Sequence, residues 1–66
     1  MNLEQLGNII RERRNELSLS QESLSEKSAI AIKTIHSIEL GKGNPSVNTL
    51  VKILDNLNLQ IIVVNK

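Results

Sequence analysis

The chain has 66 residues, a formal net charge of +1, and neither cysteine nor any Phe, Tyr or Trp side chain. It is predicted to form one domain over residues 1–66, and a domain of this size buries only about 60% of the surface that its unfolded form exposes. The lack of cysteine excludes disulfides, thiolate catalysis and cysteine-based zinc sites, and the lack of aromatic residues argues against stacking on single-stranded bases. No long apolar segment is present, which argues against a membrane span or signal peptide and favours a cytoplasmic location.

A first helix is predicted to begin at the N-terminus. Asn2 can cap this helix, and Gln5 can reach back to complete a capping box. An apolar stripe with helical spacing follows, and we expect it to pack into the core. The stripe consists of Leu3, Leu6, Ile9, Ile10 and Leu17.

A second, short helix is predicted to end at about Ser28. The hydroxyl of Ser20 can accept a backbone N–H at its start, and Glu22 lies in the first turn, where the helix dipole favours an anion. Ser18 is an alternative cap, because Gln21 three residues later would complete a capping box with it. The start of this helix is therefore left open between the two serines.

A third helix is predicted after Ile30. Ile35 and Ile38 lie three residues apart on a face that can be buried, and Gly41 supplies a left-handed stop. The opposite side carries the polar residues Lys33, Thr34, His36 and Ser37. This pattern predicts a short helix with one face in the core and one face in solvent.

A fourth helix is predicted to open at Pro45 and Ser46, since proline favours the first turn of a helix and serine can cap it. Its apolar face consists of Leu50, Val51, Leu54 and Leu57. Lys52 and Asp55 are expected to point toward solvent.

The last residues change character, because four β-branched residues follow one another and such side chains favour strand over helix. We predict a strand over residues 59–64. A single helical chain offers it no partner, so two copies are expected to pair their strands in an antiparallel ribbon across a two-fold axis. The predicted dimer interface consists of Leu59, Ile61, Ile62, Val63 and Val64. The alternative is a fifth helix that completes a monomeric core.

The segment from residue 19 to residue 46 resembles the helix-turn-helix of the phage-repressor-like (Cro/cI, also called XRE) DNA-binding family. The resemblance extends over roughly residues 3 to 57. It implies an all-α, four- to five-helix lambda-repressor-like domain with the helix-turn-helix at about residues 20–40, here followed by the C-terminal β-strand. The matching residues are Leu19, Ser20, Gln21, Glu22, Leu24, Glu26, Lys27, Thr34, Ile35, Ile38, Glu39, Gly41, Lys42, Asn44 and Pro45.

Two positions depart from the family pattern. Ala29 stands where relatives often have a turn glycine, and Ala31 stands where they often have a serine or threonine that caps the recognition helix. A missing cap costs about 0.5 to 2 kcal/mol. Either packing stabilises the third helix, or the helix begins one residue away.

The resemblance also implies which residues touch DNA, with the third helix in the major groove. The positions carried over to base edges are Ile32, Lys33, Thr34 and Ser37. Those carried over to backbone phosphates are Gln21, Lys42, Gly43 and Asn44. Arg14 and Glu39 match a family ion pair whose role is structural.

These features predict a sequence-specific repressor that binds a palindromic operator in double-stranded DNA as a homodimer. The apolar tail is similar to that of the HipB-like antitoxins, which implies a HipA-like kinase toxin as a partner. The alternative is a protein-binding module that chiefly restrains a toxin or another regulator and binds DNA only non-specifically.

An enzyme is not expected, because the chain has one histidine, no cysteine and no paired carboxylates in a plausible pocket. No cofactor and no metal site are predicted. His36 could contact DNA, sense pH or be an ordinary surface histidine.

Overall fold

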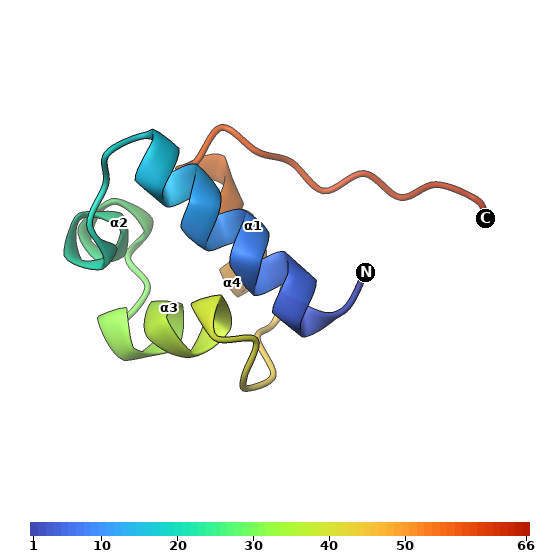
Figure 1. Cartoon of the computed structure of the whole chain (residues 1–66), viewed down its shortest axis with the longest axis horizontal. Helices are drawn as coiled ribbons and strands as arrows, with labels where there is room; N and C mark the ends of the chain where they lie inside the picture. The colour runs from blue at the N-terminus through green and yellow to red at the C-terminus, as the bar shows by residue number, and fades with distance from the viewer.

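A computed structural model describes all 66 residues and contains four helices and no β-strand. The helices are α1 (Leu3–Glu16), α2 (Gln21–Ser28), α3 (Ile32–Glu39) and α4 (Val47–Asp55). α1 crosses the molecule diagonally, with α2 beside its C-terminal end, α3 below it and α4 behind it (Figure 1). The helical part of the predicted fold is thus confirmed. No helix combines the length and the apolar character that a membrane crossing requires.

Side-chain caps fix the starts of three helices. Asn2 accepts from the Gln5 N–H at 2.8 Å, and the Gln5 side chain accepts from the Asn2 N–H at 2.9 Å, which forms the predicted capping box. Ser20 caps α2 by accepting from the Ser23 N–H at 2.9 Å. Ser46 likewise accepts from the Thr49 N–H at 3.1 Å at the start of α4. The alternative cap, Ser18, is not used.

α3 begins without a side-chain cap, since Ala31 is its N-cap residue and no side chain bonds the first N–H groups. Its start is therefore not displaced. Ile35 and Ile38 are buried on the inner face of the helix. Their burial provides the stabilisation that the missing cap does not.

The turn between α2 and α3 holds a non-glycine residue in the left-handed conformation. Ala29 has φ +59° and ends α2. A left-handed conformation costs an L-residue roughly 1–2 kcal/mol that glycine avoids. Glycine, which the family pattern often has at this position, would avoid this cost.

Replacing Ala29 with glycine is therefore expected to stabilise the fold by about 0.5 to 1 kcal/mol, once the greater backbone entropy of glycine is subtracted. Urea unfolding followed by helical circular dichroism measures this change. Ala31→Gly is the comparison at negative φ, where glycine relieves no left-handed strain and acts only through its N-cap preference and its greater backbone entropy. A loss of stability in Ala29→Gly would contradict the assigned turn conformation.

The core is aliphatic and small. It consists of Ile10, Leu24, Ile35, Ile38, Ile53, Leu54 and Leu57. In α4, the expected face was partly wrong, because Val51 is exposed and Ile53 is buried in its place. In α1, Leu3 and Ile9 of the predicted stripe are also exposed at the edge of the core. α4 ends at Asp55, so Leu57 reaches the core from the turn that follows.

Two glycines allow close approach between α1 and the end of α3. A Cβ atom on Gly7 would collide with the Ile38 carbonyl oxygen and lie 2.9 Å from the Glu39 carbonyl oxygen. Gly41, with φ +75°, stops α3, and a Cβ atom there would lie 2.7 Å from the Cα atom of Glu4. The two backbones therefore meet directly, and this contact sets the angle at which α3 leaves the core.

The C-terminal segment forms neither the predicted strand nor the alternative fifth helix. After the bond from the Leu59 N–H to the Leu54 carbonyl at 3.0 Å, the chain runs extended and makes no further backbone hydrogen bond. It leaves the helices and passes the N-terminus (Figure 1). The strand predicted to pair across two copies is not seen in the single chain, because a ladder needs a second strand and four helices provide none. Val63 is 91% exposed and Val64 is 75% exposed.

Candidate nucleic-acid interface

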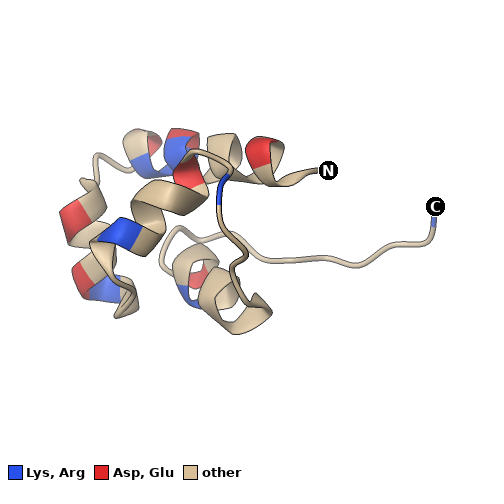
Figure 2. Ribbon diagram, turned by 90° about the horizontal axis from the view of Figure 1, so that it is seen from below, with Lys and Arg blue, Asp and Glu red and all other residues tan.

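The outer face of α3 is a ridge between two surface hollows. Lys33 and Ser37, one turn apart on the helix, line both hollows. The two side chains therefore stand on the crest of the ridge. In Figure 2, α3 and the loop after it each carry one lysine, whereas α1 and α2 carry both basic and acidic residues.

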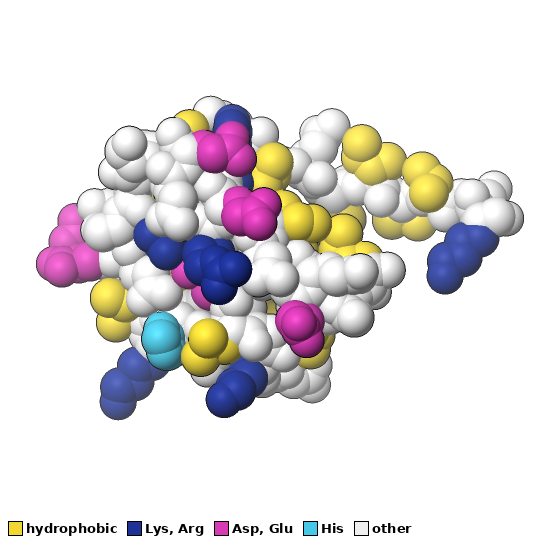
Figure 3. All heavy atoms as spheres, viewed as in Figure 1, with side chains coloured by type: hydrophobic (Ala, Val, Ile, Leu, Met, Phe, Trp, Pro, Cys, Tyr) yellow, Lys and Arg dark blue, Asp and Glu magenta, His cyan; other side chains and the backbone are white.

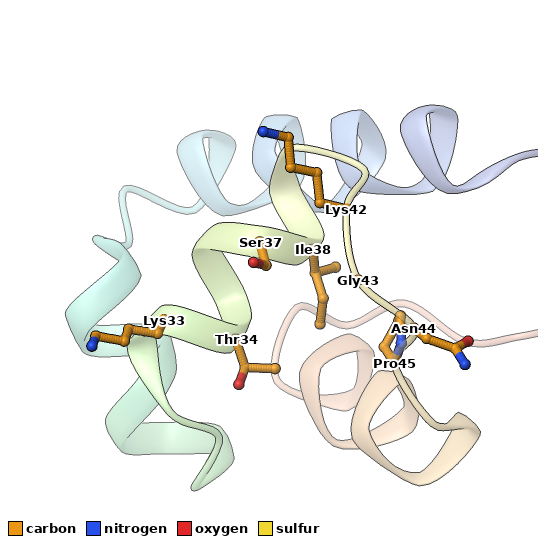
Figure 4. A pocket seen from close by; sticks show the side chains of 8 residues that line it. All are labelled: Lys33, Thr34, Ser37, Ile38, Lys42, Gly43, Asn44 and Pro45. Carbon is orange, nitrogen blue, oxygen red and sulfur yellow. The ribbon is translucent and has the colours of Figure 1, made fainter.

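The first hollow lies between α3 and the loop that follows it, and its volume is about 350 Å³. Eight residues line it: Lys33, Thr34, Ser37, Ile38, Lys42, Gly43, Asn44 and Pro45. Figure 4 shows both lysine side chains extending out from the ribbon, with the Ser37 side chain between them and Thr34 lower on the helix. The structure thus gathers six of the eight predicted DNA-contacting residues around one concave surface.

The loop of the first hollow presents free backbone donors. The Lys42 N–H is occupied, because it donates to the Ser37 carbonyl at 2.9 Å. The N–H groups of Gly43 and Asn44 bond no acceptor in the chain. Gly43 has φ +81° and nothing near its missing Cβ, so the backbone is open on this side. An anion could therefore meet two backbone amides and the Lys42 ammonium here.

The second hollow lies between α2 and α3, and its volume is about 440 Å³. It is lined by Gln21, Ile32, Lys33, His36 and Ser37. It therefore holds the remaining predicted residues, Gln21 and Ile32. Ile32 is 44% exposed and does not pack against the core. His36 is the one member of this hollow that was not among the predicted contacts.

Arg14 and Glu39 form the ion pair beneath these hollows. Arg14 Nε donates to Glu39 Oε2 at 2.7 Å, and Nη2 donates to Glu39 Oε1 at 2.9 Å. Arg14 Nη1 also donates to the Leu19 carbonyl at 2.8 Å. The Glu39 side chain is only 3% exposed. This bidentate geometry ties α1 to the end of α3 and to the start of the helix-turn-helix.

The hydrogen bond to Glu39 raises the pKa of the Arg14 guanidinium, against the opposing effect of burial and with a further contribution from the charge of the carboxylate. A basic group whose pKa is raised on folding stabilises the folded state at pH values below that pKa, and this contribution is lost as the pH rises through the raised pKa. The arginine thus keeps its charge throughout the physiological range, and only strong alkali removes it.

Gln21 is held by the same carboxylate. Its Nε2 donates to Glu39 Oε1 at 3.2 Å, while the backbone N–H groups of Gln21 and Glu22 at the start of α2 have no partner in the chain. The second hydrogen of the amide nitrogen stays free to donate outward. Sequence reasoning missed this bond, because 18 residues separate the pair and no local pattern joins them.

Comparison with known proteins identifies relatives of this chain. A family model described as helix-turn-helix matches residues 10–63. HTH-type transcriptional regulatory proteins from two strains of Methanococcus maripaludis are 36% identical to the chain over 56 residues, which is 85% of this chain. The chain spans only 17% of the length of those relatives.

A solved structure matches the fold closely. It is the restriction-modification controller protein C.AhdI from Aeromonas hydrophila, with a TM-score of 0.83 and 29% sequence identity. The match covers 88% of each chain.

Proposed function

Because the chain belongs to the helix-turn-helix family of Cro/cI (XRE) type, which comprises DNA-binding transcriptional regulators, we propose that it is a sequence-specific repressor of transcription. It binds a palindromic operator in double-stranded DNA as a homodimer. One observation supports this proposal: the exposed ridge of α3 has a basic and a hydroxyl side chain on its crest, and backbone N–H groups without a partner lie on both flanks.

In the proposed complex, the crest of α3 enters the major groove, which is wide enough to admit a helix. Lys33 can donate to guanine O6 or N7, and Ser37 can donate or accept at a neighbouring base. Thr34 lies on the loop flank and can hydrogen-bond a base edge or a phosphate. Ile32 lies on the other flank, where it can contact a thymine methyl group.

The flanks hold the two backbones of the groove. On one side, Gln21 and the free N–H groups at the start of α2 bind a phosphate, because a helix N-terminus favours an anion. On the other side, Lys42 and the free amides of Gly43 and Asn44 bind a second phosphate. These contacts set the orientation of α3, and the crest residues supply the selectivity.

Selection of bound duplexes from a random DNA pool at near-physiological salt tests the proposal. We expect enrichment of inverted half-sites about one helical turn apart. The variant Lys33→Ala/Ser37→Ala should remain folded and lose preference for those sites, since each good base contact contributes about 1–3 kcal/mol of discrimination. Lys52→Ala is the control, because Lys52 lies outside both hollows. No enrichment by folded wild type would refute sequence-specific binding.

The tail is proposed to join two copies. Its backbone groups are unpaired, and the side chains from Ile61 to Val64 are each at least half exposed. Pairing with the tail of a second copy would satisfy those groups and bury the side chains in an antiparallel ribbon. The segment is thus a strand only within the proposed dimer.

Deletion of residues 59–66 is expected to convert a dimer into a monomer, as measured by light scattering. The four helices should persist, because the core lies upstream, although the partly buried Leu59 is lost with the tail. Ile62→Lys/Val64→Lys is the matched full-length variant, which keeps Leu59 and should also be monomeric. A dimer that survives in both variants would contradict the tail interface.

Two settings are proposed for such a regulator. Similarity to C.AhdI supports control of restriction-modification genes. The bare apolar tail supports the second, an antitoxin whose main task is to restrain a toxin such as a HipA-like kinase. Co-purification from the native host distinguishes them, because an antitoxin should bring down a stoichiometric protein partner and a controller should not.

A further inference from the structure

His36 occupies a defined place that the proposed DNA contacts leave unused. It is exposed, and it lies three residues after Lys33 and four after Ile32, on the flank of α3 that faces Gln21. Figure 3 shows this single histidine standing clear on the surface, with basic side chains nearby. It lines the second hollow and not the first.

The inference rests on the proposed function. If α3 lies in the major groove, this flank faces one sugar-phosphate backbone of the DNA. The crest residues Lys33 and Ser37 separate the two hollows, so a helix with its crest in the groove has one DNA backbone along each hollow. Gln21, on the far wall of the second hollow, is proposed to bind the backbone on that side. His36 lines the same hollow from α3, so it lies on the same side of the crest as Gln21.

Lys33 is the one charged residue that lines the same hollow as His36. Glu39 of the same helix is paired with Arg14 of α1. The helices packed against α3 carry further charges, among them Glu22 in the first turn of α2 and the exposed Arg11 of α1. No salt bridge involves His36, so its imidazole is free for a ligand.

We propose that protonated His36 binds a DNA backbone phosphate beside the one held by Gln21, so that this repressor binds its operator more tightly in mildly acidic solution. An imidazolium can donate a charge-assisted hydrogen bond to a phosphate oxygen, and neutral imidazole donates a weaker one. His36 is the only histidine of the chain.

The test measures operator affinity at about pH 5.5 and about pH 8 for wild type, His36→Gln and Lys42→Gln, using a duplex enriched from the random pool. Wild type should bind roughly tenfold more tightly at the lower pH. The slope of log affinity against log salt should also be steeper there by about 0.9, for one more neutralised phosphate. His36→Gln, which retains a donor without titrating, should lose both differences.

Lys42→Gln should weaken binding at both pH values and keep the pH dependence, because Lys42 lines the other hollow and His36 is unchanged in this variant. Wild-type binding that is independent of pH, or equal pH dependence in His36→Gln, would overturn the role of His36 and leave the proposed function intact. Absence of any preferred duplex would overturn both. Circular dichroism at each pH verifies that the helices persist, so that a difference reports binding.

Discussion

Glu39→Gln is expected to destabilise the fold by about 3 to 5 kcal/mol, because it leaves the Arg14 guanidinium, whose side chain is only 12% exposed, without its counter-charge. The whole stability of a domain this size is roughly 3 to 10 kcal/mol. The variant should therefore be partly or wholly unfolded at room temperature. Urea unfolding followed by circular dichroism measures the loss.

The matched control for this substitution is Glu26→Gln, which changes an exposed carboxylate that has no partner within the chain. We expect a change within about 0.5 kcal/mol there. The double variant Arg14→Met/Glu39→Met should recover most of the stability, since it removes both charges together. A loss below about 1 kcal/mol in Glu39→Gln would show that the pair contributes little.

Gly7→Ala is expected to destabilise the fold by about 1 to 3 kcal/mol, even though alanine is the better helix former by about 1 kcal/mol. The added methyl group would overlap the carbonyl oxygens at the end of α3. Backbone atoms cannot swing aside as a flexible side chain can, so the two helices must separate. Thermal unfolding should show a lower Tm, by about 4 to 8 °C for each kcal/mol.

Glu12→Ala is the control on the same helix, because Glu12 is exposed and makes no hydrogen bond or salt bridge. It should be neutral or slightly stabilising. If Gly7→Ala were stabilising too, the direct backbone crossing of α1 and α3 would be contradicted. Operator binding by partly folded Gly7→Ala should weaken in proportion to the unfolded fraction, since Gly7 lies in neither hollow.

Local chemistry made the helix starts predictable. Asn2, Ser20 and Ser46 each need only the residues three positions later, so a short stretch of sequence contains the whole interaction. The period of the apolar residues in α3 likewise identified its inner face. Val51 was misplaced because adjacent apolar residues in α4 fit two similar faces, and only packing against the other helices chooses Ile53.

Features that join distant segments were harder to predict. Nothing near Gly7 indicates that it lies against the end of α3, because a helical glycine looks the same in sequence wherever it is. The bond from Gln21 to Glu39 also depends on how the helices pack. The tail illustrates another limit: its β-branched residues favour an extended backbone, but a strand exists only when a second strand is present.

The division of α3 into two faces has a consequence for how such a scaffold changes its target. Ile35 and Ile38 hold the helix in the core, while Ile32, Lys33 and Thr34 are exposed and make no side-chain contribution to the core. The proposed DNA-facing positions can therefore be exchanged at little cost in folding. After a gene duplication, a few substitutions on that outer face would change the operator that one copy binds, and the two copies would remain equally stable.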